Sequence, residues 1–188
     1  IGQDTRRSGS MLSASLAAGI ASVGGNCYMV GVIPTPAIAY LTRTHHMDAG
    51  VMISASHNPF EYNGIKFFDQ YGFKLPDATE DTLEEYLLKD EQTGLHTRPT
   101  GADVGLISDW RNLHEEYIDF ICRSTDVDLT GLKVVHDGAN GAASEVGPEI
   151  LKRLGAEVIA IHHEPNGINI NDHCGSTHLD SLKEAVLA

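Results

Sequence analysis

Residues Met52–Phe68 read MISASHNPFEYNGIKFF, and this stretch carries the pattern from which the fold can be inferred. It begins with an apolar pair that is typical of the end of a buried strand. A polar cluster with Ser56 and His57 follows, and an apolar run returns after the turn signal Asn63-Gly64. The pattern predicts two neighbouring strands joined by a polar loop.

Periodic patterns on both sides of this loop predict an α/β fold. Apolar residues recur at helical spacing in four segments, and apolar runs bounded by turn signals predict three strands. The predicted helices cover residues 9–23, 36–46, 79–89 and 107–123. The predicted strands cover residues 27–36, 47–56 and 63–72. Residues 90–105 are polar and contain glycine, so we expect a surface connection there.

A second unit begins after a polar stretch near residues 125–130. Residues 132–167 show an apolar run, a glycine-bearing turn, an amphipathic segment and another apolar run. This order predicts a βαβ unit with parallel strands. We therefore predict one domain over residues 1–127 and part of a second α/β domain over residues 128–188. The chain begins at a strand end and stops inside a helical pattern, so we expect a piece of a longer protein.

The composition limits the possible functions. The chain has 188 residues, with 13 Lys and Arg against 26 Asp and Glu, and a formal net charge of −13. This acidic balance argues against nucleic acid or an anionic membrane as a general partner. No apolar run approaches the ~20 residues that cross a bilayer, so we expect a cytoplasmic protein. The three cysteines are widely spaced and suggest neither a disulfide framework nor a CxxC metal site.

The polar loop allows two interpretations. Ser56 and His57 suggest a nucleophile and its base, but neighbours on an extended segment point to opposite faces, and no G-x-S-x-G elbow is present. A hydrolase triad is therefore disfavoured. The alternative is a polar turn in which Ser and Asn side chains cap backbone groups before Pro59.

Three other groups of residues could bind a ligand or take part in a reaction. Arg6 and Arg7 precede Ser8-Gly9-Ser10 at the expected start of a helix, and could bind an anion or simply form an exposed helix cap. Lys66 lies in an apolar strand, where it could transfer protons or occupy a solvated edge. The histidine pairs lack metal-ligand spacing, and the turn at residues 137–143 matches neither a P-loop nor GxGxxG.

Three motifs together resemble a known family. The segments GQDTRRSG, SASHNPFEYNGIKFF and DGANGA resemble, in order and spacing, those of the α-D-phosphohexomutases. The resemblance implies that Ser56, rather than Ser54, carries a phosphoryl group. In this family the serine gives its phosphate to a sugar phosphate, and the bisphosphate returns its other phosphate to the serine. The resemblance also implies a first domain with a mixed sheet between helices.

The same resemblance implies roles for neighbouring residues. Arg6 would steady the transferring phosphate and Lys66 would assist proton transfer. His57 would act as a second acid or base, and Asn58 would shape the loop. Arg6, Asn58 and Lys66 would also bind the substrate. The family binds Mg²⁺ through the phosphoserine and an Asp-Gly-Asp-type loop, which this sequence lacks, so Ser56 would be the only ligand here. We therefore predict that the chain alone has no mutase activity.

Within the family, the segment PNGININDHCGSTH and the alanine before Ser56 resemble the bacterial phosphoglucosamine mutases. This branch implies interconversion of glucosamine 6-phosphate and glucosamine 1-phosphate, for UDP-N-acetylglucosamine and cell-wall precursors, and a possible homodimer through the first domain. Two alternatives are a phosphoglucomutase or phosphomannomutase, and a non-catalytic interaction domain. The missing P-loop disfavours a nucleotide-binding module.

Overall fold

The computed structural model describes residues 1–88 and 98–188. A four-stranded sheet forms its N-terminal part, with the order β3-β1-β4-β5. Its strands are β1 (Gly2–Gln3), β3 (Gly31–Val32), β4 (Ala49–Ile53) and β5 (Ile65–Asp69). The first three are parallel, whereas β5 runs antiparallel to β4. The predicted mixed sheet is therefore confirmed.

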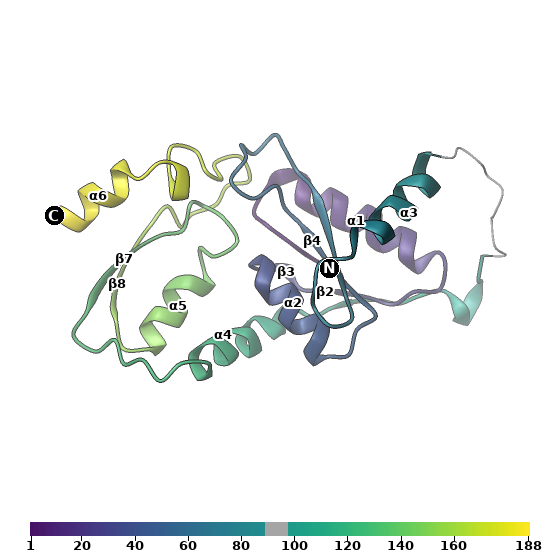
Figure 1. Cartoon of the computed structure of the whole chain (residues 1–188), viewed down its shortest axis with the longest axis horizontal. Coiled ribbons are helices and arrows are strands. Elements are labelled where there is room, and N and C mark those ends of the chain that lie inside the picture. The colour runs from purple at the N-terminus through teal and green to yellow at the C-terminus, as the bar shows by residue number, and fades with distance from the viewer. Residues whose placement is uncertain (89–97) are drawn as a thin grey trace.

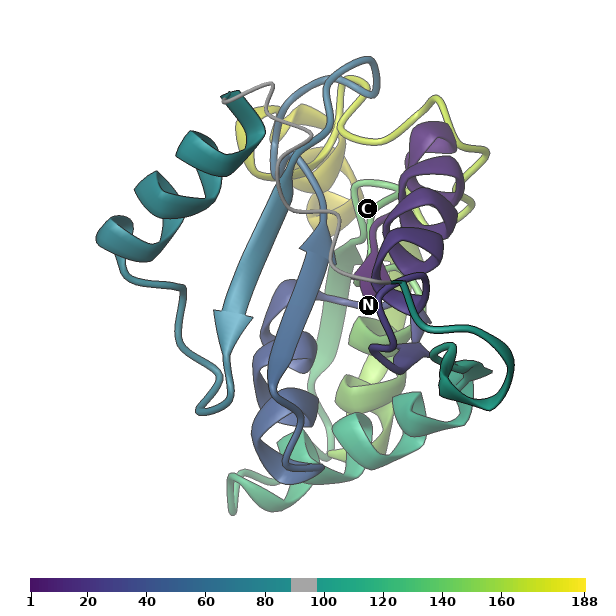
Figure 2. The same ribbon diagram turned by 90° about the vertical axis from the view of Figure 1, so that its right-hand side faces the viewer.

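Helices cover both faces of this sheet (Figures 1 and 2). A Cβ atom on Gly2 would collide with Ile38 of helix α2 (Thr35–Thr44), so this face of β1 packs against α2. The next residue, Gln3, points to the opposite face and contacts helix α1 (Arg7–Ala21), where its amide oxygen accepts a 2.6 Å hydrogen bond from Ser13. Strand alternation thus places α1 and α2 on opposite faces.

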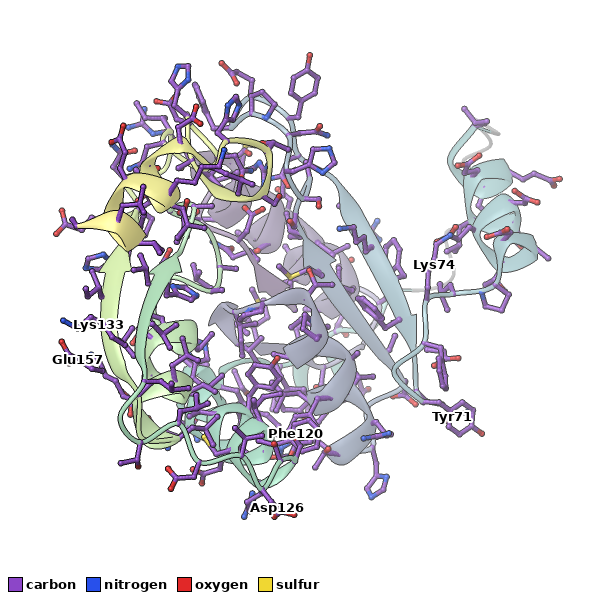
Figure 3. The ribbon with its side chains drawn as sticks, turned by 60° about the vertical axis from the view of Figure 1, so that its left-hand side comes forward. Tyr71, Lys74, Phe120, Asp126, Lys133 and Glu157 are labelled. Carbon is purple, nitrogen blue, oxygen red and sulfur yellow. The ribbon has the colours of Figure 1, made fainter. Side chains whose placement is uncertain are left out.

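The hydrophobic core lies on the α2 face. Helix α4 (His114–Arg123) packs there against α2, and Tyr40 stacks on Phe120 with ring centroids 4.1 Å apart. Phe120 is labelled in Figure 3. The buried members of this cluster are Val30, Ile33, Ala37, Ile38, Leu41, Met52 and Tyr117.

Two segments differ from the predicted elements. The run at 27–36 forms two short strands, β2 (Cys27–Met29) and β3, because Gly31 adopts a φ of 72° and redirects the chain. The predicted helix over 107–123 was wrong at its N-terminal end. Residues Ile107–Asp109 form strand β6, which pairs in parallel with β2. The carboxylate of Asp109 then accepts the backbone N–H of Arg111 at 3.1 Å and turns the chain before α4 begins.

The second unit is the predicted parallel βαβ arrangement. Strand β7 (Lys133–Asp137), helix α5 (Val146–Arg153) and strand β8 (Glu157–Ile161) follow one another, and β7 pairs in parallel with β8. Helix α6 (Asp180–Leu187) contacts β7. In Figure 3, Lys133 and Glu157 mark the paired strands, and their side chains form a 3.2 Å ion pair.

One arginine connects the second unit to α4. Arg153 of α5 donates to Glu149 of its own helix at 2.8 Å, and to Glu115 and Asp119 of α4 at 2.7 and 2.9 Å. Figure 1 shows α4 along the lower edge of the molecule, between the N-terminal and C-terminal parts. This cluster of one guanidinium and three carboxylates is the Arg153 hub.

Helix α3 (Asp77–Leu88) stands away from the rest of the chain (Figures 2 and 3). It begins two residues before the predicted start, and the predicted end at 89 lies outside the described residues. Lys74 pairs with Glu80 at 2.9 Å and with Asp77 at 3.2 Å at the start of the helix. Residues 98–105 of the predicted connection contain a 3₁₀ turn (Gly101–Asp103), and the remainder lies outside the described residues. In the described part of the chain, no helix is long and apolar enough to cross a membrane.

Candidate functional site

The sheet topology brings the two predicted polar clusters together. Strands β1 and β4 are parallel neighbours, so the residues that follow Gln3 and Ile53 leave the sheet at the same edge. The strand order reverses at β1, since β3 lies on one side of it and β4 on the other. In open α/β sheets, ligands bind outside the carboxyl ends of the strands at such a reversal. The edge that carries Arg6 and Ser56 is therefore the candidate site.

A buried ion pair follows β1. The side chains of Arg6 and Asp4 are 0% and 3% exposed, and the guanidinium bonds directly to the carboxylate. The same carboxylate accepts the backbone N–H of Arg6 at 3.0 Å. Arg6 is the cap residue of α1 but makes no side-chain cap hydrogen bond. Its guanidinium instead bonds to the loop that follows β4.

Arg6 holds the backbone of the serine loop, residues 54–64. Its Nη2 donates to the carbonyl oxygens of Ser56 at 3.1 Å and Asn58 at 2.5 Å. At the base of the loop, the Ser54 N–H donates to the Gly64 oxygen at 2.9 Å, which continues the β4–β5 ladder. The Ser54 hydroxyl accepts the N–H of Ser56 at 3.1 Å. Hydrogen bonds thus hold the backbone at the base of the loop, while residues 56–59 are exposed to solvent.

Ser56 occupies an uncommon backbone conformation. Its φ is 55°, in the left-handed region that costs a non-glycine residue about 1–3 kcal/mol. Ser56, His57 and Asn58 are all exposed. The buried Arg6–Asp4 pair below them holds the strained backbone, so the hydroxyl of Ser56 is presented at the surface of the site.

A segment more than 100 residues away completes the support of the loop. The side-chain amide of Asn171 donates to the carbonyl oxygens of Ser56 and Asn58 at 3.0 and 3.1 Å. Nearby, the backbone N–H of Arg7 donates to the Gly167 oxygen at 2.8 Å, and the Thr5 hydroxyl donates to the Asn140 oxygen at 2.5 Å.

The turn at 137–143 orients the segment that carries Asn171. The carboxylate of Asp137 accepts the N–H groups of Ala139 and Gly175, both at 2.8 Å. Asn140 is 7% exposed, and its side-chain amide bonds to the backbone of residues 164 and 169. Burial raises the pKa of the Cys174 thiol in this segment, as do the neighbouring aspartates. The turn is engaged in holding the protein backbone, in agreement with its interpretation as a structural turn.

Lys66 lies close to the base of the loop. It pairs with Met52 across the β4–β5 ladder and is half-buried. Within residues 1–88 and 98–188 its ammonium makes no hydrogen bond or ion pair. Lys66 lies on the edge strand β5, opposite the buried Met52, and a role in proton transfer stays a prediction. Ser8, expected at a helix start, accepts a 2.9 Å hydrogen bond from Asn63 of the loop.

The site does not supply a complete set of metal ligands. Across the described ranges, no group of three or more His, Cys, Asp and Glu side chains could hold a metal ion. Mg²⁺ prefers several hard oxygen ligands in octahedral geometry. The buried carboxylate beneath the loop, Asp4, already bonds to Arg6, and Glu61 is the one carboxylate within the loop itself. The residues present therefore do not fit a magnesium site by themselves.

Sequence reasoning identified Arg6, Ser56, His57, Asn58 and Lys66, and the fold places all five at or beside one loop. It did not identify Asn171, Asn140 or Thr5 as contributors. The only available signal was the asparagine-rich run at residues 166–171, which is typical of backbone bonding and left-handed conformations.

Comparison with known proteins agrees with this geometry. The model of the family "Phosphoglucomutase/phosphomannomutase, alpha/beta/alpha domain I" matches residues 1–94. A phosphoglucosamine mutase of Desulforamulus reducens is 54% identical over 187 residues, covering 100% of this chain and 42% of the relative. Another from Heliobacterium modesticaldum is 52% identical over 202 residues, covering 100% of this chain and 44% of the relative.

The fold is also found in solved structures. A phosphoglucomutase/phosphomannomutase family protein from Burkholderia thailandensis superposes with a TM-score of 0.76 at 24% identity. The match covers 99% of this chain and 40% of that chain. The present chain thus spans less than half the length of the relatives that it matches.

Proposed function

Because the chain belongs to the phosphoglucomutase/phosphomannomutase family, we propose that it is the phosphoserine-bearing part of a phosphoglucosamine mutase. Two relatives that carry this name match the whole chain at 54% and 52% identity, which supports glucosamine phosphate as the substrate. The relatives extend well beyond the matched region. The complete activity would therefore depend on parts of the enzyme outside this chain.

The observation that carries the proposal is the presentation of Ser56. Ser56 is exposed in the serine loop, on a left-handed backbone whose carbonyl oxygen is held by the buried Arg6. Phosphoryl transfer depends mainly on positioning and on charge neutralisation, with little covalent chemistry left to the protein. A serine fixed in this way suits a residue that gives and accepts a phosphoryl group.

The proposed reaction has two transfers. First, an oxygen of the sugar attacks the phosphorus of phosphoserine 56, the P–O bond to the serine breaks, and the serine oxygen takes up a proton. The product is glucosamine 1,6-bisphosphate. After the bisphosphate has turned over in the site, the serine oxygen attacks the other phosphorus. The bond between this phosphorus and the sugar oxygen breaks, and the proton passes from the serine oxygen to the sugar oxygen. Phosphoserine 56 is thereby restored.

The neighbouring residues would serve these transfers in different ways. Lys66 and His57 are candidates to carry the proton between the sugar hydroxyl and the Ser56 oxygen. Arg6 is engaged with Asp4 and two backbone carbonyls, so its support of the phosphate would act chiefly through the position of the loop. Asn58 contributes one of these carbonyls, which fits a role in shaping the loop.

Two further parts of the proposal concern partners. Mg²⁺ would neutralise phosphate charge when bound, but its ligands other than phosphoserine 56 must come from outside the described residues. A homodimer through the N-terminal domain is a separate proposal, and the molecular mass in solution would test it. Glucose or mannose phosphate is the alternative substrate, since the matched family takes its name from those two mutases.

The test uses a chimaera. The matching 187-residue segment of the D. reducens enzyme is replaced by this chain, and turnover of glucosamine 6-phosphate is measured with Mg²⁺ present. Ser56→Ala should abolish turnover. The control is Ser15→Ala, which removes an exposed serine hydroxyl from α1 and should leave the rate unchanged.

Mass spectrometry provides the second measurement. In the active chimaera, the tryptic peptide that ends at Lys66 should gain about 80 Da, the mass of one phosphoryl group. Fragmentation should assign it to Ser56 rather than Ser54. Turnover that survives Ser56→Ala, or a phosphate on another residue, would contradict the proposal.

A further inference from the structure

We propose that Asn171 is a positioning residue for Ser56, through which the second unit of the chain sets the geometry of the serine loop. The effect of Asn171 on catalysis rests on the proposed function. The positional effect itself concerns the loop alone and is measured separately.

The contacts of Asn171 are directed at the backbone of the reacting residue. Its Nδ2 lies 3.0 Å from the Ser56 oxygen and 3.1 Å from the Asn58 oxygen. These are the same two oxygens that accept from Nη2 of Arg6, at 3.1 and 2.5 Å. A carbonyl oxygen has two lone pairs, so each of these oxygens is satisfied by two donors from different parts of the fold.

The two donors differ in origin. Arg6 follows β1, lies beneath the loop and is 1% exposed. Asn171 lies 115 residues after Ser56 and reaches the loop from the segment between β8 and α6. Arg6 alone would leave the two carbonyls held from one side. Asn171 is a second donor to them and so restricts rotation of the Ser56–His57 and Asn58–Pro59 peptide units.

Asn171 is itself held firmly. Its φ of 58° lies in the left-handed region, which asparagine tolerates better than most residues. Its backbone N–H donates to the Ala139 oxygen at 2.9 Å. Asp137 fixes Ala139 on one side and Gly175 on the other. A continuous chain of hydrogen bonds therefore runs from the end of β7 to the loop that carries Ser56.

This arrangement has a chemical consequence. A displacement of about 1 Å at a reacting atom can lower a rate by roughly 100-fold. The hydroxyl of Ser56 is carried by a strained and exposed loop, so its position depends on what holds the neighbouring carbonyls. Loss of Asn171 should loosen that position without unfolding the protein, because the Arg6–Asp4 pair remains.

Hydrogen exchange of the complete 188-residue chain tests the positional effect. In Asn171→Gly, the amides of residues 54–64 should exchange about 3- to 10-fold faster, the range expected for the loss of one net hydrogen bond. Glycine is chosen because it retains the left-handed conformation without strain. Asn171→Asp should have at least as large an effect, because it keeps the size of the side chain but turns an oxygen toward the two carbonyls.

The matched control is His173→Gly. His173 also has a positive φ, of 51°, but its side chain is 90% exposed and contacts no part of the serine loop. This substitution should leave exchange in residues 54–64 unchanged. Unchanged loop exchange in Asn171→Gly, equal effects of both glycine variants, or a milder effect in Asn171→Asp than in Asn171→Gly would each overturn the proposal.

The chimaera then tests the effect on catalysis. Asn171→Gly should lower kcat by about 10-fold or more and leave KM within about twofold, since the loop is misplaced but the substrate site is kept. A raised KM with normal kcat would overturn the catalytic part. If Ser56→Ala has no effect on turnover while Asn171→Gly still loosens the loop, the proposed function fails and the positional role of Asn171 stands.

Discussion

Replacement of Arg6 by alanine should be unusually destabilising for a single substitution near the surface of a site. The carboxylate of Asp4 is 3% exposed and would keep only one donor, the backbone N–H at position 6. Leaving one member of a buried ion pair without its partner typically costs about 3–5 kcal/mol. The two loop carbonyls released by Arg6→Ala add little, because water reaches the exposed loop and replaces the lost donor. We therefore expect a loss of roughly 3–5 kcal/mol, dominated by Asp4.

The assay is urea unfolding followed by circular dichroism, with a double variant as the decisive comparison. Asp4→Leu combined with Arg6→Met removes both charges, and apolar replacement of a buried pair is often neutral. The double variant should thus be clearly more stable than Arg6→Ala, while its serine loop exchanges faster than that of the wild type. Lys133→Ala breaks an ion pair whose side chains are 60% and 69% exposed and should leave the unfolding curve unchanged. A loss below about 1 kcal/mol in Arg6→Ala, as for an exposed pair, would refute the reasoning.

Two further predictions follow from buried titratable groups. Burial lowers the pKa of His136, whose Nδ1 has no hydrogen-bond partner among the described residues, so the folded chain resists protonation there. The free energy of unfolding should therefore fall as the pH decreases below about 6.5, where the unfolded chain takes up the proton. In urea titrations at several pH values, His136→Leu should flatten this pH dependence. The control His173→Leu, at an exposed site, should not. An unchanged slope in His136→Leu would contradict the assignment of this pH dependence to His136. Burial also raises the pKa of Cys27 and Cys174, so a thiol reagent should modify half-buried Cys122 first and the other two only on unfolding; rapid labelling of Cys174 in the folded chain would show that its segment is open.

Local pattern was sufficient for most elements of the fold but not for those defined by distant pairing. The βαβ unit and the two strands around the serine loop follow from hydrophobic periodicity and turn signals. The segment Ile107–Asp109 lies shortly before the amphipathic helix α4, and its three residues are compatible with either a helix or a strand. It becomes a strand because Cys27–Met29, about 80 residues earlier, offers it a partner. No window of neighbouring residues contains that information.

The same limit explains what was missed at the candidate site. Arg6 and Ser56 could be associated because each follows a strand, and parallel neighbours end at one edge. The physical role of Arg6 was harder to foresee, since a sequence does not reveal that its guanidinium is enclosed by Asp4 and two carbonyls. Asn171 reaches the loop through a turn, several residues with positive φ and a segment without regular structure. Such contacts depend on the tertiary fold and leave almost no local pattern.

The Arg153 hub concentrates the ion pairs between α4 and α5 on a single cation. If Arg153 is neutralised, Glu115, Asp119 and Glu149 face one another without a counter-charge, so attraction between the helices turns into repulsion. A lysine would not be an equivalent replacement, because its ammonium is a point charge without the planar fork that serves several carboxylates. Dissolved salt would screen the hub, whereas the buried Arg6–Asp4 pair would be nearly insensitive to it. Ionic strength is therefore a means of weakening the charged contact between α4 and α5 while the ion pair beneath the serine loop stays intact.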